Sequence, residues 1–263
     1  MHYYKAKVKY IGTKYAGFQL QSKIETVQSE FNDALLKIIT EKFTTMPASR
    51  TDTGVHALEQ IVKITSYVPI DISVFVKKIN ELLSSQIRCI DIINCEGSFR
   101  PAAEARLKEY RYFFTNKTQV SKSDRLFIAN ISNQLDFDMI KKCLLVLKGE
   151  HDFCNFYSSG SNIKSTIRNI SLCELLEVNP NDIFKAHDLF QIPDSVQKCY
   201  QLRFEANGFL KQMIRHIVSA LWMVGSGKLT IEEFRTYLTG PKMEKQLWKV
   251  APPNGLFLFK ISY

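Results

Sequence analysis

The amino-acid sequence predicts a mixed α+β protein made of two similar halves, each a largely antiparallel sheet with helices on one face. Two observations point to this class. Segments in which every second residue is apolar alternate along the chain with segments of helical period. The alternation runs twice, over residues 1–104 and again over residues 105–263. If the two sheets join edge to edge, a central cleft forms between the halves.

The first half opens on a strand, because apolar residues and lysines alternate strictly over residues 4–10. The face of this strand that carries the lysines is expected to be exposed to solvent or to contact phosphate. Apolar side chains at helical spacing behind a capping residue, Ser22 or Thr26, predict a helix over residues 27–41. The same patterns predict a short strand over 43–46, a strand over 60–65, a helix over 71–83 and a strand over 87–94.

The second half repeats this alternation and closes on a strand. The run GSGK over residues 225–228 lacks the first glycine and the hydroxyl residue of a phosphate-binding loop, so it predicts a helix end in which glycine supplies a positive φ. The run GEHDF over 149–153 predicts a helix stop and a turn. Strands are expected over residues 105–115, 166–178, 199–206 and 256–262, and helices over 139–147, 209–224 and 231–238.

Composition narrows the class of protein. The chain has 263 residues, 45% of them apolar, which can build a sizeable core. No run approaches 18 apolar residues and the start lacks the apolar segment of a signal peptide, so we expect a globular cytoplasmic protein. The six cysteines and five histidines show no metal-ligand spacing, so neither a metal nor a disulfide framework is expected. A formal charge of +9 favours a polyanionic partner such as nucleic acid.

One carboxylate stands out in the motif ASRTDTGVHA over residues 48–57. Asp52 can be a turn residue that caps the amides of Thr53 and Gly54. Arg50 lies two positions before it, on the same side of an extended chain, and a cation within about 4–6 Å lowers a carboxylate pKa by about 1–3 units. Such an aspartate stays ionised, which suits a nucleophile or an electrostatic stabiliser. It does not suit an aspartic protease, whose two carboxylates share a proton.

Together with the rest of the chain, this loop resembles that of the tRNA pseudouridine synthase A family. Several separate segments recur in the order of that family, and they cover essentially the whole chain. They are YIGTKYAGFQLQ (10–21), TVQSEFNDAL (26–35), SRTDTGVHA (49–57), KEYRYFF (108–114), LKGEHDF (147–153), NGFLKQMIRHIVSAL (207–221), VGSG (224–227) and APPNGLFLFKISY (251–263).

The resemblance implies a pseudouridine synthase fold and an enzyme that isomerises uridine to pseudouridine in the anticodon stem-loop of tRNA, at positions 38, 39 and 40. It implies Asp52 as the catalytic aspartate, Tyr110 as the tyrosine against the target base, and Arg50 and Arg215 as basic residues that bind the substrate. It further implies a homodimer that needs no metal or cofactor. The half over residues 1–104 would carry the catalytic loop, and the half over residues 105–263 would complete the cleft.

The chemistry leaves several alternatives open. Asp52 can attack C1′ of the ribose or remove the 2′ proton, and both routes need it ionised. Tyr112 lies on the same strand face as Tyr110, so the pattern alone does not separate an aromatic platform from a core tyrosine. Two departures from the family, Phe18 for a tryptophan and Ala102 for an arginine, put some RNA contacts in doubt. A non-catalytic tRNA-binding or tRNA-folding protein on the same scaffold is the alternative function.

Overall fold

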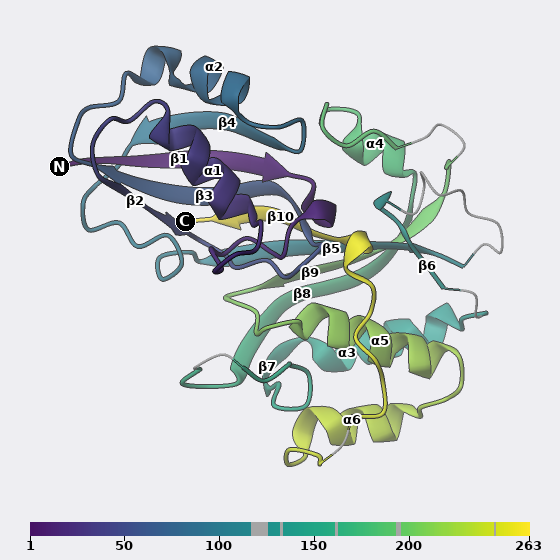
Figure 1. Ribbon diagram of the computed structural model, residues 1–263. Helices are drawn as coiled ribbons and strands as arrows, with labels where there is room; N and C mark the ends of the chain where they lie inside the picture. The colour runs from purple at the N-terminus through teal and green to yellow at the C-terminus, as the bar shows by residue number, and fades with distance from the viewer. Residues whose placement is uncertain (117–125, 132–133, 161–162, 193–195, 245) are drawn as a thin grey trace. The chain divides into compact units, whose positions relative to one another are not determined.

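The computed structural model describes the chain except for residues 117–125, 132–133, 161–162, 193–195 and 245, and it divides into two compact units (Figure 1). Unit 1 contains Met1–Arg106, Ala186–Gln191 and Phe257–Tyr263. Unit 2 contains Leu107–Lys185 and Ile192–Leu256. The first division falls close to residue 104, and two later segments belong to unit 1.

Unit 1 is built on a mostly antiparallel sheet. β1 (His2–Tyr10) lies between β4 (Ile87–Asn94) and β3 (His56–Ser66) and is antiparallel to both. Two strands share the other edge of β3. β10 (Leu256–Ser262) runs parallel to the start of β3, and β2 (Phe43–Pro47) runs antiparallel to its end.

The strict alternation in β1 has the predicted effect on burial, because its apolar side chains alternate with half-exposed lysines. The lysines are engaged within unit 1. Lys7 forms a salt bridge of 3.2 Å with Glu59, and Lys9 forms one with Asp188. The ammonium of Lys5 lies 5.2 Å from the ring centroid of Tyr263. This face of β1 is therefore covered by contacts from its own unit.

Two helices pack in unit 1, and each begins at a cap that the sequence marks. α1 (Val27–Leu36) starts at Thr26, whose hydroxyl accepts from the amide of Ser29 in a reciprocal capping box. α1 ends at Leu36, earlier than residue 41. α2 (Ile72–Leu82) starts at Asp71, whose carboxylate accepts from the amide of Ser73. A short 3₁₀ helix, η1 (Gly12–Lys14), follows β1.

Within unit 2 the strands pair in the order β5 (Leu107–Thr115), β9 (Cys199–Ala206), β8 (Ile167–Val178) and β7 (Gly149–Asp152), and all three pairs are antiparallel. A two-residue strand, β6 (Ala129–Asn130), runs parallel to the end of β5. The run GEHDF stops α3 (Phe137–Leu147) as predicted, with Gly149 at φ 109°, but the chain continues into β7 rather than into a turn.

The helices of unit 2 include one that carries a predicted site residue. α5 (Met213–Gly225) begins later than residue 209, because Gln212 before it has φ 57°. It ends as predicted, with Gly227 at φ 71°. In the part of unit 2 that the structure describes, the chain also forms α3, α4 (Pro180–Phe184), α6 (Ile231–Thr239) and the 3₁₀ helix η3 (Pro253–Gly255).

The predicted α+β class with largely antiparallel sheets is confirmed. All six cysteines are free thiols. Within the described ranges of the chain, no helix has both the length and the apolar character needed to cross a membrane.

Candidate active site

Asp52 lies in a tight turn directly before β3. The amide of Val55 donates to the carbonyl oxygen of Asp52 at 3.1 Å, and Gly54 inside the turn has φ 78°. A glycine is needed there, because side chains other than glycine rarely adopt a positive φ. Asp52 is half-buried and Arg50 is exposed.

The turn is held against the segment that follows β1. The amide of Phe18 donates to the carbonyl oxygen of Thr51 at 3.1 Å, and the amide of Gly54 donates to that of Tyr15 at 3.3 Å. Gly17 has φ 98°, and a Cβ there would lie 2.7 Å from the carbonyl oxygen of Thr51. These contacts fix the backbone on both sides of Asp52.

Gly12 makes a second close approach to the same loop. A Cβ at Gly12 would lie 1.9 Å from the carbonyl oxygen of Val55, so no other residue fits without movement of the backbone. The amide of Gly12 donates to Nδ1 of His56 at 3.1 Å, and this Nδ1 therefore carries no proton. His56 is fully buried, and its ring stacks on Phe257 with 4.7 Å between centroids. His56 is thus a packing residue of the loop.

Buried polar groups complete the support below the loop. Tyr10 Oη and Thr51 Oγ1 share a hydrogen bond of 2.8 Å. The side-chain amide of Gln60 donates to the carbonyl oxygen of Ser49 at 2.7 Å and accepts from its amide at 3.1 Å. Phe18, at the position where the resemblance led us to expect a tryptophan, is 1% exposed, and its ring centroid lies 5.8 Å from that of Tyr10. The replacement is therefore accommodated as part of the core of unit 1.

The two tyrosines of β5 make different contacts. Both lie on one face of the strand, opposite Phe204 and Leu202 of β9. Tyr112 is fully buried, its hydroxyl donates to the carbonyl oxygen of Pro252 at 2.8 Å, and burial raises the pKa of its phenol. Tyr110 is 6% exposed and its ring packs edge-on against Phe209 at 5.2 Å. Both tyrosines are therefore buried, and Tyr110 stays the residue that the resemblance predicts to contact the target base.

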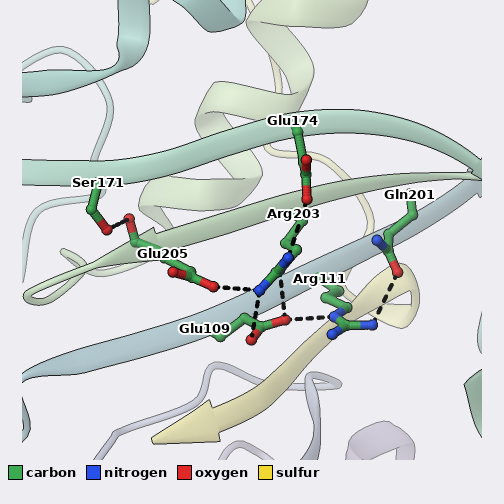
Figure 2. Close-up of polar contacts among 7 residues, drawn as sticks. All are labelled: Glu109, Arg111, Ser171, Glu174, Gln201, Arg203 and Glu205. Carbon is green, nitrogen blue, oxygen red and sulfur yellow. Dashed lines mark hydrogen bonds and ion pairs between the residues drawn. The ribbon is translucent and has the colours of Figure 1, made fainter. Parts of the chain in front are cut away.

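The opposite face of β5 carries an ionic network (Figure 2). The carboxylate of Glu109 accepts from Nε of Arg111 at 2.6 Å and from Nε of Arg203 at 2.9 Å. Arg203 also contacts Glu174 at 3.2 Å and Glu205 at 2.5 Å. Because neighbouring residues of a strand face opposite ways, this network lies behind Tyr110 and ties β5, β9 and β8 together.

Arg215 lies in the first turn of α5 and is 8% exposed. Its Nε donates to the carbonyl oxygen of Ala251 at 2.6 Å, and the amide of Ala251 donates back to the carbonyl oxygen of Arg215 at 3.3 Å. The neighbouring His216 is 1% exposed, and burial together with the charge of Arg215 lowers its pKa to about 4. The guanidinium is thus the persistent cation of this turn at neutral pH.

The predicted site residues are therefore all in folded segments, with Arg50 and Asp52 in unit 1 and Tyr110 and Arg215 in unit 2. Gly12 and Gly17 also shape the Asp52 loop, and neither is among the site residues that the sequence predicts. Both glycines lie in the segment YIGTKYAGFQLQ, which is one of the segments that recur in the family. Glycine has no functional group, so its residue type does not suggest a role in a site. Within the residues that the structure describes, no three His, Cys, Asp or Glu side chains are grouped to hold a metal ion.

Comparison with known proteins matches the whole chain to one family. The family described as "tRNA pseudouridine synthase" matches residues 145–263. The tRNA pseudouridine synthase A of Thermoanaerobacter sp. (strain X514) is 34% identical over 256 residues, which cover 97% of each chain. That of Pseudothermotoga lettingae is 31% identical over 267 residues and the full length of both chains. That of Aster yellows witches'-broom phytoplasma is 32% identical over 261 residues, covering 99% of this chain and 98% of the relative.

A solved structure described as "Crystal Structure of a Cbf5-Nop10-Gar1 Complex" aligns to 83% of this chain and 45% of its own, with 13% identity and a TM-score of 0.34. The assignment does not depend on it, because the full-length relatives exceed 30% identity. The chain belongs to the tRNA pseudouridine synthase A family and is therefore an isomerase, a tRNA pseudouridine synthase.

Proposed function

We propose that this isomerase acts on uridines of the anticodon stem-loop of tRNA, at positions 38, 39 and 40, with Asp52 as its catalytic residue. The observation that carries the proposal is the fixed geometry of the Asp52 loop. Hydrogen bonds to Tyr15 and Phe18 and the close approach of Gly17 hold the backbone on both sides of the carboxylate. A preorganised charged group is what a reaction at a sugar carbon requires.

The reaction breaks the bond between N1 of uracil and C1′ of the ribose, turns the base, and joins C5 to C1′. C5 then loses its proton and N1 gains one, so the product is an isomer of the substrate. An ionised Asp52 can attack C1′ to form a covalent intermediate, or it can take the 2′ proton on the way to a glycal. Both routes use the same carboxylate, and both need the detached base to stay in place.

Tyr110 is proposed to hold that base. A target uridine in a stem must be unstacked and turned out of the helix, which costs a few kcal/mol. Contact with an aromatic ring offsets about 1–3 kcal/mol per base. The edge-on contact with Phe209 and the ionic network behind β5 keep the ring of Tyr110 in one position.

Positive charge is proposed to hold the rest of the tRNA. Arg50 is exposed beside the catalytic loop, and Arg215 keeps its charge at neutral pH, so both can contact phosphate. The net charge of +9 per chain doubles in the homodimer that we propose by analogy with the family. Such binding reads the RNA backbone and its shape rather than its base sequence.

The proposal is tested by mapping pseudouridine in an unmodified tRNA transcript after incubation with the protein. Chemical labelling and mass spectrometry are expected to find new pseudouridine only at positions 38, 39 and 40. Conversion at other positions would contradict the proposed specificity. Tight tRNA binding without any conversion would favour the alternative, a non-catalytic tRNA-binding or tRNA-folding protein.

A further inference from the structure

A hollow of about 300 Å³ lies on unit 2, where the segment after β7 meets the segment after α6. Its lining includes Tyr157, Ser158 and Ser159 from the first segment and Lys242 and Gln246 from the second. Pockets that hold small molecules have volumes of about 300–1,000 Å³. The hollow is at the low end of that range, so it suits one small group rather than a large cofactor.

A buried amide holds the walls of the hollow together. Asn155 is 2% exposed, and its Nδ2 donates to the carbonyl oxygens of Tyr237 and Pro241 at 2.9 and 3.1 Å. Its Oδ1 accepts from the amide of Met243 at 2.7 Å. The side chain of Gln246 donates to the carbonyl oxygen of Asn155 at 2.9 Å. These bonds join the two segments without a ligand, so the hollow is formed in advance.

The lining combines an aromatic ring with a cation. The ammonium of Lys242 lies 5.7 Å from the centroid of the half-exposed ring of Tyr157. Proteins that bind single-stranded RNA stack bases on aromatic rings and contact the backbone with cations. Lys242 is exposed, so its flexible side chain can reach a phosphate while the ring takes a base. The hydroxyl of the exposed Ser159 adds a hydrogen-bonding group at the rim.

One wall of the hollow is connected to the helix that carries Arg215. Ser158 Oγ donates to Oε1 of Gln212 at 2.5 Å and lies 2.9 Å from Nε2 of His216. The amide of Ser158 donates to the carbonyl oxygen of Lys211 at 3.1 Å. Gln212 is the residue with positive φ at the start of α5. A ligand in the hollow would therefore contact Ser158, which is hydrogen-bonded to the turn before Arg215.

A larger hollow of unit 2, about 760 Å³, has a cation, Lys142, among the described residues that line it, but does not combine it with an aromatic ring. It has no aromatic side chain there. Two of its polar groups, Asp136 and Thr230, already cap the starts of α3 and α6. These two polar groups are therefore already engaged in helix capping.

We propose that the hollow between Tyr157 and Lys242 binds a single unpaired nucleotide of the RNA substrate, with the base on the tyrosine ring and a phosphate on the lysine. This nucleotide is distinct from the uridine that reacts. The inference rests on the proposed function for the identity of the RNA. It adds a binding site in unit 2 that anchors the substrate beside the start of α5.

Equilibrium binding of a tRNA transcript to the full chain tests the site. An Asp52→Asn background removes turnover, so binding is measured independently of catalysis. Tyr157→Ala is expected to weaken tRNA binding by about 5- to 100-fold, the usual effect of removing one stacking ring, whereas Tyr157→Phe keeps the affinity within about 2-fold. Lys242→Ala should weaken binding and reduce the slope of log Kd against log salt by about 1.

Two exposed residues outside the hollow, Tyr67 and Lys141, give matched controls, and their alanine variants should bind like the background protein. Affinity unchanged in both Tyr157→Ala and Lys242→Ala would overturn the site, even if the wild-type protein forms pseudouridine. Crosslinking of tRNA that contains 4-thiouridine provides a measurement free of folding effects. A crosslink to residues 154–159 supports the site, and crosslinks confined to other segments refute it.

Discussion

Gly17 and Gly227 share a left-handed backbone conformation but differ in how closely other atoms approach them. Gly17 has φ 98° beside the Asp52 loop, and Gly227 has φ 71° after α5. A Cβ at Gly17 would lie 2.7 Å from the carbonyl oxygen of Thr51, whereas a Cβ at Gly227 would meet nothing within 4 Å. Both positions strain an L-residue, but of the two only Gly17 also lies in close contact with the Asp52 loop.

Replacement of each glycine by alanine separates these effects. Gly227→Ala should cost about 1–2 kcal/mol of stability, the strain of a left-handed residue, and keep wild-type turnover. Gly17→Ala adds a clash with backbone, so we expect a larger fall in Tm and a clear loss of kcat. Thermal unfolding and single-turnover assays on both variants provide the comparison. Equal effects of the two substitutions would show that the contact with Thr51 does not shape the site.

At the scale of the element, local patterns predicted most strands and helix caps. The bounds of β4, β9 and β10 agree with their alternating or apolar runs, and Thr26 caps α1 as expected. β7 was missed because four residues are too few to show a period. β3 starts at His56 rather than residue 60, because its first residues pair with β10 about two hundred positions away.

The ionic network behind Tyr110 is expected to matter for stability, because Glu109 is 7% exposed and accepts from two arginines. Glu109→Leu leaves Arg111 and Arg203 without their shared partner, but the two arginines are 19% and 28% exposed and keep other partners, so we expect a cost of about 1–3 kcal/mol. Urea unfolding measures this cost. The exposed pair of Lys141 with Asp138 is the control, and Lys141→Ala should cost less than about 1 kcal/mol. Similar costs for the two variants would show that the network contributes only as a surface pair.

His216 makes the start of α5 sensitive to acid. Its pKa is lowered to about 4 in the folded state from an ordinary value near 6.5, so the unfolded chain binds the proton more tightly. This contribution to stability is complete above pH 6.5 and is lost as the pH falls toward 4, by roughly 3 kcal/mol in total. His216→Gln keeps a donor for Ser158 and cannot titrate. Its free energy of unfolding should vary less than that of the wild type between pH 6.5 and 4, and an identical pH dependence would contradict the assignment.

For the molecule as a whole, the sequence predicted two α+β halves but not which late segments of the chain belong to the first unit. Ala186–Gln191 and Phe257–Tyr263 belong to unit 1 although they follow most of unit 2 in the chain. Periodicity is a local property, so it does not show which sheet a late strand joins. The site shows the same limit. Asp52, Tyr110 and Arg215 are predicted from their motifs, whereas the glycines beside the Asp52 loop emerged only from the contacts.

We propose that Asp52 performs the chemistry while other groups bind the RNA. This proposal is tested most directly by single-turnover formation of pseudouridine in an anticodon stem-loop transcript, with tRNA affinity measured in parallel. Asp52→Asn is expected to reduce isomerisation by more than about 10²-fold, because the neutral amide can neither attack C1′ nor accept the 2′ proton, while Kd stays within a few-fold. Substantial turnover by this variant, with pseudouridine at the same positions, would contradict the account.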